Sequence, residues 1–283
     1  DGGTVSTGPS TAVTGSALQL SGGVSVGNAI NLQGTGNVLL GGINFGGQLQ
    51  SVSGTNTTTG VIRADFDAAI GADAGVLNID GTIHNTTTSA RAFAFNAQGS
   101  SVINLNSNMT AATATVNQYF ALRKYGTGTL NITTANTIVP TTDITVLQGT
   151  MALKDAGTIL GGAAIPILVN PGATLTLDNS GTNTNNRLGT TRLITLSGNL
   201  NVIGSAAGTT TQTFAAPTFA RGQTIVTVTP GAGQTAALVF GAPNNPSPAI
   251  NATTSPSGAT ALFRGLGLGT AAGPNVATIA STT

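Results

Sequence analysis

The stretch Val76-Leu77-Asn78-Ile79-Asp80-Gly81 returns as Val102-Ile103-Asn104-Leu105-Asn106, and again as Thr129-Leu130-Asn131-Ile132-Thr133. Apolar and polar residues alternate in each copy, which is the pattern of a β-strand with one buried face. Further runs of this kind lie at 150–153, 173–177, 199–203 and 224–228. This recurring run, bounded by Gly, Asn or Asp, decides the fold class.

The spacing of the runs predicts a stack of repeated coils. One central residue of each run recurs after 21 to 27 residues, in the order Ile79, Leu105, Ile132, Leu153, Leu177, Leu200 and Ile225. A period of roughly 20 to 50 residues indicates a solenoid, in which each repeat buries its apolar face against its neighbours. At roughly 23 residues per coil and ~4.8 Å per strand, we expect about twelve coils and a rod of about 60 Å. The alternative is a two-sheet β-sandwich, because turn signals also occur at closer spacing.

The composition of the 283 residues suits an all-β stack. Only 6% are charged, 40 are Gly, and Glu is absent, so helix-forming residues are scarce. The only stretch with a helical option is 111–124, and its Thr113, Thr115 and Val116 disfavour that option. Gly supplies the positive φ of tight turns. In a stack, Val, Ile and Leu are expected inside and Thr and Asn outside, and charges are few because like charges would repel on successive coils.

The same composition excludes several partners. The net charge is +1, and the nine basic residues are too scattered to neutralise a run of phosphates, so we expect no nucleic acid. Without Cys there is neither a disulfide framework nor a thiolate metal site. The longest apolar run, 159–169, is too short to span a bilayer, and Asp1-Gly2-Gly3 does not open a signal peptide. We therefore expect a protein that does not span a membrane and has no cofactor.

One region resembles a known family. The segment Arg123-Lys124-Tyr125-Gly126-Thr127-Gly128-Thr129-Leu130-Asn131-Ile132, followed by Asp143-Ile144-Thr145-Val146-Leu147-Gln148-Gly149-Thr150-Met151-Ala152-Leu153, is similar to the autotransporter-associated β-strand repeat. That repeat pairs a Lys-x-Gly-x-Gly-Thr-Leu strand with a Thr-x-Val-x-x-Gly-Thr-Leu strand, and Met151 stands where the second Leu is usual. Residues 169–177 resemble a second, degenerate copy. Companion segments resemble those of long bacterial surface proteins at 186–189, 193–200 and 263–269.

The best-matching region is 121–204, and the first hundred residues match in composition alone. The resemblance implies a right-handed parallel β-helix that is exported and displayed outside a bacterial cell, with no catalytic residues. We expect residues 1–283 to form a single β-solenoid, either complete or as a fragment of a longer chain. The Pro-rich stretch 241–258 is expected to protrude as a loop and to be the place of a partner contact.

A few residues could carry chemistry. Asp65 and Asp67, with Asp73 nearby, are the best candidates for acid/base catalysis on a glycan or for calcium, because residues i and i+2 of a strand share a face. A solvated surface or pairing with Arg63 and Arg91 is the more economical interpretation. His84, the only histidine, lies four residues from Asp80 and could pair with it across a turn, although a surface or corner position is expected.

Other motifs are weaker. Gly23-Val24-Ser25-Val26-Gly27 matches a nucleophile elbow, but that motif needs a following helix, and another alternating run follows instead. Gly34-Thr35-Gly36 and Gly126-Thr127-Gly128 are interpreted as turns rather than phosphate loops. Tyr119, Phe120 and Tyr125 could form a sugar-stacking platform or, more simply, pack locally. Glycosylation sequons begin at Asn56, Asn85, Asn108, Asn131 and Asn251.

The leading expectation is a non-catalytic structural or adhesive β-solenoid on a bacterial surface or in a filament, with no catalytic, cofactor-binding or metal-binding residues. Open strand edges at the ends of such a stack predict end-to-end self-association or continuation into further coils, and a glycan or host-surface contact is a further option. The competing hypotheses are a polysaccharide-active β-helix lyase or hydrolase, and an S-layer or pilin-like subunit.

Overall fold

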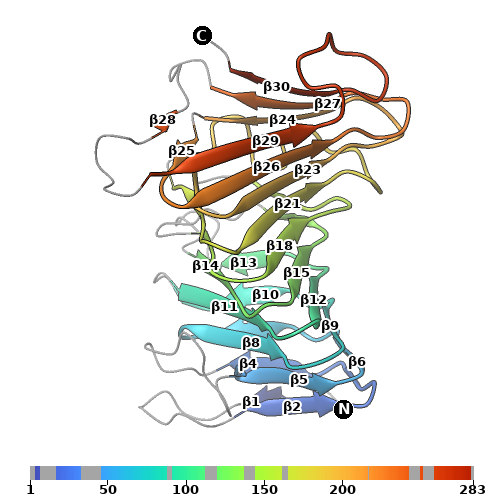
Figure 1. Cartoon of the computed structure of the whole chain (residues 1–283). Coiled ribbons are helices and arrows are strands. Elements are labelled where there is room, and N and C mark those ends of the chain that lie inside the picture. The colour runs from blue at the N-terminus through green and yellow to red at the C-terminus, as the bar shows by residue number, and fades with distance from the viewer. Residues whose placement is uncertain are drawn as a thin grey trace.

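The computed structural model of the chain describes residues 4–6, 17–32, 46–87, 91–111, 120–136, 144–160, 165–215, 217–241, 249–250 and 258–281. Every regular element in these residues is a β-strand, and none is a helix. Accordingly, no described helix is long and apolar enough to cross a membrane. The strands form one elongated stack that begins near β2 at the end marked N and finishes near β30 at the end marked C (Figure 1).

Two long sheets form most of the stack. The first sheet contains, in spatial order, β2 (Leu18–Ser21), β5 (Leu49–Ser53), β8 (Ala68–Ala72), β11 (Arg91–Ala97), β14 (Phe120–Tyr125), β17 (Ile144–Val146), β20 (Ile167–Val169), β22 (Ile194–Leu196), β25 (Thr218–Phe219) and β28 (Ala249–Ile250). The second sheet contains β3 (Ser25–Val26), β6 (Thr55–Thr58), β9 (Val76–Ile79), β12 (Val102–Leu105), β15 (Thr129–Ile132), β18 (Thr150–Leu153), β21 (Thr174–Asp178), β23 (Asn199–Ile203), β26 (Gln223–Thr229) and β29 (Thr260–Gly265).

A third face closes each coil and is divided into three shorter sheets. These are β1 (Thr4–Ser6), β4 (Ala29–Leu32), β7 (Ile62–Ala64), β10 (Ile83–Asn85) and β13 (Met109–Ala111); then β16 (Ala135–Asn136) and β19 (Thr158–Ile159); then β24 (Thr210–Phe214), β27 (Ala236–Phe240) and β30 (Ala277–Ser281). Each coil therefore contributes one strand to the first sheet, one to the second and, in most coils, one to the third face.

The strand pairing confirms the parallel β-helix and shows that the two-sheet sandwich is wrong. Every pairing between the described strands is parallel, and each strand pairs with the strand one coil earlier or later, as β9 does with β6 and β12. The only antiparallel contact among the described residues is an isolated bridge between Ser205 and Gly208. A sandwich would instead be built from antiparallel hairpins and Greek-key connections.

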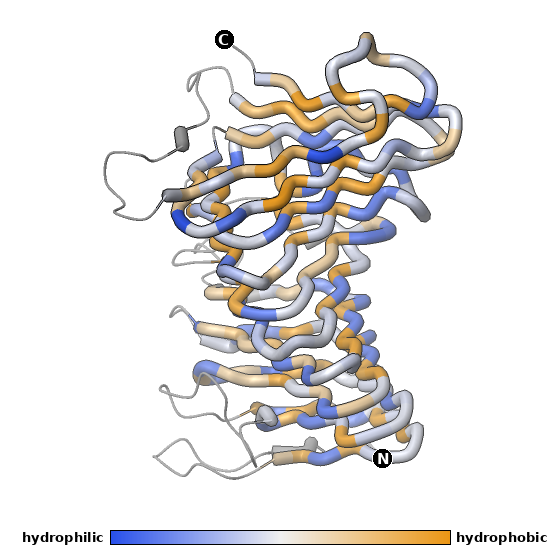
Figure 2. The backbone as a smooth tube through the Cα atoms, in the orientation of Figure 1, coloured by the Kyte–Doolittle hydropathy of each residue, from blue (hydrophilic) through white to orange (hydrophobic). Residues whose placement is uncertain are grey.

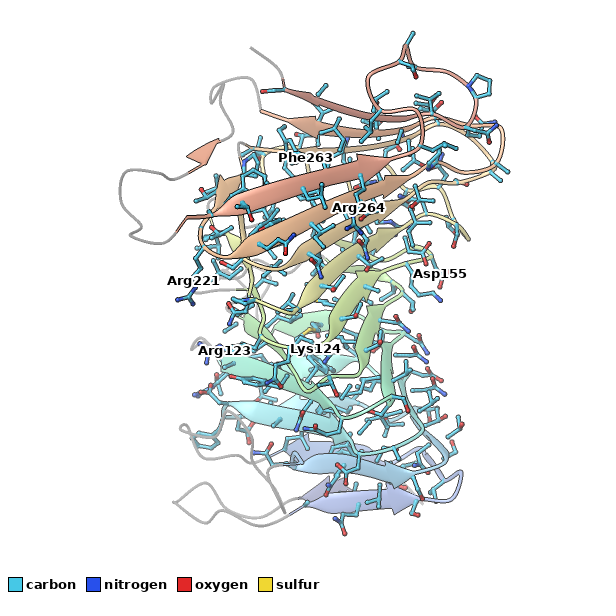
Figure 3. The ribbon with its side chains drawn as sticks, viewed as in Figure 1. Arg123, Lys124, Asp155, Arg221, Phe263 and Arg264 are labelled. Atoms are coloured by element: carbon cyan, nitrogen blue, oxygen red, sulfur yellow. The ribbon has the colours of Figure 1, made fainter. Side chains whose placement is uncertain are left out.

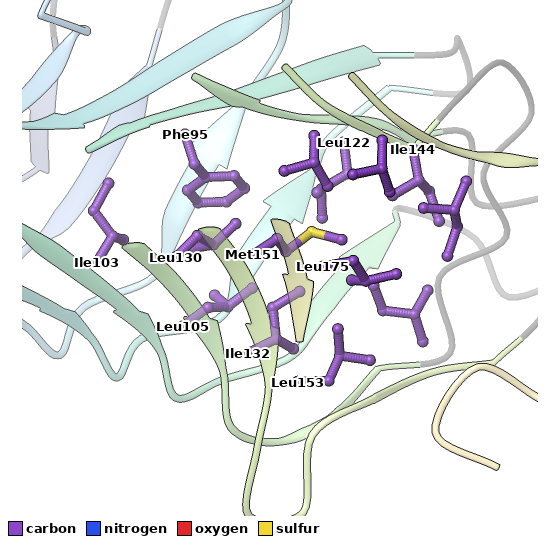
Figure 4. Close-up of a cluster of buried hydrophobic side chains, with 14 of the residues drawn as sticks. Phe95, Ile103, Leu105, Leu122, Leu130, Ile132, Ile144, Met151, Leu153 and Leu175 are labelled. Carbon is purple, nitrogen blue, oxygen red and sulfur yellow. The ribbon is translucent and has the colours of Figure 1, made fainter. Parts of the chain in front are cut away.

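The core consists of columns of apolar side chains that run along the stack. In the second sheet, one inward column is Leu77, Ile103, Leu130, Met151, Leu175, Leu200 and Val226, all 0% exposed. Figure 4 shows Leu130, Met151 and Leu175 of this column lying across the interior from Leu122 and Ile144 of the first sheet. Apolar and polar residues alternate along these strands (Figure 2). Met151 therefore fills a leucine position, as its flexible side chain allows.

In the described residues each long sheet has ten strands, fewer than the twelve coils expected. The coils have unequal lengths: Val26 pairs with Thr58, 32 residues on, and Val228 pairs with Gly265, 37 residues on. Ten strands at ~4.8 Å correspond to a stack of about 45 Å.

Two of the central residues chosen for the repeat, Leu200 and Ile225, do not belong to the same column as the first five. Leu177 pairs with Val202, so Leu200 belongs to the neighbouring inward column, and Ile225 points outward. Both lie in long strands with several apolar residues, where the central position is ambiguous.

The stretch with a helical option is a strand in its described part, because residues 120–125 form β14; residues 112–119 lie outside the described residues. The region that resembles the repeat forms consecutive coil strands from β14 to β23. Gly126-Thr127-Gly128 is a turn between β14 and β15, as expected. Gly126 has φ +74°, and a Cβ there would lie 2.1 Å from the Ala97 carbonyl oxygen, so the coils approach each other too closely for a side chain.

Candidate functional site

The acidic cluster lies in a corner and not on a strand face. Asp65 and Asp67 occupy the bend between β7 and β8, so the i, i+2 geometry expected for them is wrong. The Asp65 carboxylate accepts a hydrogen bond from the Thr86 hydroxyl, and Asp67 accepts one from the backbone N–H of Ala92 at 2.9 Å. Each carboxylate thus holds the chain of the next coil, which gives it a structural use.

Asp73 is too far away to complete a calcium site with the other two carboxylates. It follows β8 at the opposite end from Asp67, about 20 Å along the strand, and its carboxylate accepts a hydrogen bond of 2.6 Å from Gln50 Nε2. In the described part of the chain, no three His, Asp, Glu or Cys side chains come close enough to hold a metal ion. Arg91 lies with its guanidinium 5.2 Å from the Phe66 ring centre and donates Nε–H to Thr87.

His84 and Asp80 do not form a pair. His84 points outward from β10, where its Nδ1 lies 3.0 Å from the Thr110 hydroxyl of the next coil. Asp80 follows β9 on the second sheet and accepts a hydrogen bond of 2.8 Å from Asn106 Nδ2. Each side chain is therefore bound to its own neighbour one coil on, and the histidine has the surface position that the sequence suggested.

The nucleophile-elbow match is structural as well. Ser25 begins β3 and is exposed, and the chain continues into strand β4 instead of a helix. Two of the sequon asparagines, Asn56 and Asn85, are buried, and Asn56 donates and accepts five hydrogen bonds that join the turns of two coils. Tyr119, the side chain of Phe120, Gly34-Thr35-Gly36, Asn251 and most of the 241–258 loop lie outside the described residues.

The side chains with the most unusual environments are three buried cations, none of which was expected to be buried. Lys124 is 0% exposed and stands in the inward column of the first sheet, between Phe95 and Val146 (Figure 3). Its Nζ donates to the carbonyl oxygens of Tyr125 at 2.6 Å and Gly126 at 2.7 Å, and of Gln148 at 3.4 Å in the next coil. Burial lowers the pKa of Lys124 to about 8.

Arg187 is buried among oxygen acceptors from two successive coils. Its Nε donates to Asn179 Oδ1 at 2.9 Å, and its two terminal nitrogens donate to four backbone carbonyls, those of Asp155, Gly157, Asp178 and Thr182, at 2.6 to 2.9 Å. Burial lowers its pKa to about 10, although the charges of Asp178 and Asp155 oppose that shift. Arg192, also 0% exposed, donates to the carbonyls of Ile159 and Ile165, and burial lowers its pKa to about 10.

The inward position of one of these cations, Lys124, could be predicted from the sequence. Lys124 follows the inward Leu122 by two residues, so strand alternation alone places it inside. Arg187 follows a polar segment without alternation, and only the folded chain shows which carbonyls converge on it. These cations satisfy the backbone acceptors of turns and do not face a site where a substrate could bind.

The outer face of the second sheet carries two polar ladders. In one, Asn131 Nδ2 donates to Asn104 Oδ1 at 2.8 Å and Asn104 Nδ2 donates to Asn78 Oδ1 at 2.8 Å. In the other, Thr133 donates to Asn106 Oδ1 and Asn106 donates to Asp80. The expected arrangement, with Asn and Thr outside, is confirmed here.

The last coil leaves core side chains uncovered. Strands β28, β29 and β30 each stand at the end of their sheet, and no described strand pairs with their outer edges. We call these three strands the C-terminal edge. Phe263 continues the inward column after Val226, and its ring meets those of Phe219 and Phe240 at centroid distances of 5.9 and 6.4 Å. It is nevertheless 40% exposed, whereas the seven preceding members of its column are fully buried.

Fold and side-chain environments together define a parallel β-solenoid whose polar and charged groups serve mainly to join its coils. A comparison of the chain with protein-family models, with curated proteins and with solved structures finds no match.

Proposed function

We propose that the chain is a non-catalytic structural or adhesive β-solenoid, displayed on a bacterial surface or assembled into a filament. One observation carries the proposal: the residues best suited to catalysis are separated and bound to neighbouring coils. Asp65 and Asp67 hold the following corner, Asp73 binds Gln50, and His84 contacts Thr110. A lyase or hydrolase would need such groups to converge on one substrate.

Display outside the cell is supported by the resemblance of residues 121–204 to the surface-protein repeat. The amide and hydroxyl groups on the outer face of the second sheet suit contact with a surface or a glycan. The C-terminal edge supports the second half of the proposal. No described strand pairs with its outer side, and Phe263 is 40% exposed there, which favours end-to-end association or continuation of the stack.

Two measurements test the proposal. The purified chain and an Asp65→Asn, Asp67→Asn variant are incubated with acidic and neutral polysaccharides, and new chain ends and unsaturated products are followed. We expect no turnover by either protein; cleavage by the parent that the double variant lacks would refute the non-catalytic assignment. In cells that produce the chain, external protease should remove it while a cytoplasmic marker stays intact, and protection of the chain would refute surface display.

A further inference from the structure

The C-terminal edge combines backbone groups that point away from the stack with the partly exposed core residue Phe263. In a parallel ladder, one residue directs both its N–H and its C=O to the same neighbouring strand, and the next residue directs them to the other side. The N–H of Thr260 bonds to Gly222 on the β26 side. The backbone groups of Ala261, Phe263 and Gly265 therefore point to the free edge of β29, in line with the uncovered Phe263 ring.

The N-terminal end of a second copy does not match this edge. In the second sheet β3 has two residues, whereas β26 and β29 have seven and six, so the coil widens toward its C-terminal end. Pairing β3 with β29 would leave most of the β29 edge uncovered. Leu20, an inward residue of the first coil, is already 96% buried, so that end also has less apolar surface to cover. The C-terminal edge of another copy, by contrast, offers a β29 strand of the same six-residue length.

We propose that two copies of the chain associate through their C-terminal edges, with the two β29 strands antiparallel about a two-fold axis. This deepens the end-to-end association proposed above by naming the end and the partner. The register that uses every outward N–H of β29 places Phe263 opposite Phe263 of the second copy and Ala261 opposite Gly265. Arg264 is an exposed residue of β29 (Figure 3). The register also places Leu262 opposite Arg264, so the Arg264 side chains of the two copies do not face each other.

A single-cysteine experiment tests the register. The chain has no cysteine, so Phe263→Cys introduces the only thiol. Hydrogen-bonded antiparallel partners have Cα atoms about 5.5 Å apart, within the usual disulfide range of about 4.4–6.8 Å. Under mild oxidation most of this variant should become a covalent dimer. The control is Leu160→Cys, since Leu160 is also 40% exposed but lies on the side of the stack. Equal cross-linking of the two variants, or none at position 263, would overturn the proposed register.

Molecular mass in solution tests the association without a cysteine. Light scattering coupled to size exclusion should give a dimer for the parent chain. Ala261→Pro removes an outward N–H of β29 and should give a monomer, whereas Val24→Lys, at the opposite end, should leave the dimer intact. A monomeric parent, open-ended growth, or a monomer produced by Val24→Lys would each overturn the proposal. Unchanged far-ultraviolet spectra show that the variants are folded. The glycan and protease assays remain independent of these results.

Discussion

Arg187 offers the sharpest test of how this solenoid is held together. The change Arg187→Met keeps a long apolar stem and removes the guanidinium that joins two coils. Five oxygen acceptors then lose the Arg187 donor. The Gly157 carbonyl loses it in a fully buried bond, whereas Asn179 Oδ1, also buried, still accepts a hydrogen bond from the Thr184 N–H at 2.8 Å. The matched control is Arg221→Met, because Arg221 is exposed on the turn before β26.

The magnitude rests mainly on the Gly157 carbonyl. Leaving a buried acceptor without a donor costs about 1–3 kcal/mol. Water can reach the three part-buried carbonyls, which limits their share. The lowered pKa shows that burial disfavours the charged guanidinium, so its removal returns part of the loss. We expect a net destabilisation of about 2 kcal/mol. Arg187→Lys offers three donors for five acceptors, so its loss of stability should lie between those of Arg221→Met and Arg187→Met.

Stacked repeats can open locally, so the assay must resolve position. Hydrogen exchange read by mass spectrometry should show faster exchange in peptides covering 155–159 and 179–189 of Arg187→Met, with little change in the first four coils. Urea unfolding measures the accompanying loss of stability. If Arg187→Met and Arg221→Met unfold at the same urea concentration and exchange alike, the guanidinium does not hold these coils and our account of the site is wrong.

Three further predictions follow from other parts of the stack. Lys124 has a pKa of about 8 in the folded chain against 10.5 when unfolded, so the unfolded state binds more protons between these two pH values. The free energy of unfolding should therefore rise by about 3 kcal/mol from pH 8 to pH 10.5. Below pH 8, Lys124 should no longer make this free energy depend on pH. Urea unfolding across that range should show the rise in the parent and in Lys154→Met but not in Lys124→Met. At Gly75, with φ +75°, a Cβ would lie 2.1 Å from the Gly54 carbonyl oxygen, whereas Gly172 has a similar φ of +78° and open space around it. Gly75→Ala should therefore lose about 2 kcal/mol more stability than Gly172→Ala. Equal thermal unfolding midpoints of the two variants would contradict the close approach at Gly75. Asn106→Asp places a second carboxylate beside Asp80 and should cost about 1 kcal/mol at low salt, less at high salt, with Asn106→Ser as the uncharged control; a penalty that ignores salt would not be electrostatic.

Strand alternation was enough to predict the repeated element and its stacking. Runs such as 76–79, 102–105 and 129–132 are strands that pair in the expected register, because a half-buried strand needs no information beyond its own alternation. The number of coils was not predictable in the same way. Connections of different length separate the strands, and a mean period cannot show where they occur.

The candidate site could be only partly anticipated. His84 was expected on the surface and is there, but Asp65 and Asp67 were expected on a strand and lie in a bend. Composition could not identify the buried cations either, since a count treats Lys124 and Arg221 alike. Which backbone carbonyls remain unpaired at a corner depends on the path of adjacent coils, and that path decides where a buried cation is stabilising.

The position of the charges supports a physical reason for their scarcity. The outward central column of the second sheet holds nine consecutive uncharged residues and then one charge, in the order Ser25, Thr57, Asn78, Asn104, Asn131, Ala152, Thr176, Asn201, Thr227 and Arg264. Only the last member, with a single neighbour in the column, is charged. Like charges on successive coils at ~4.8 Å would repel by about 1 kcal/mol even in water. Arg264 is therefore tolerated where the column ends, and a partner strand there must avoid a second cation, as pairing with Leu262 of another copy does.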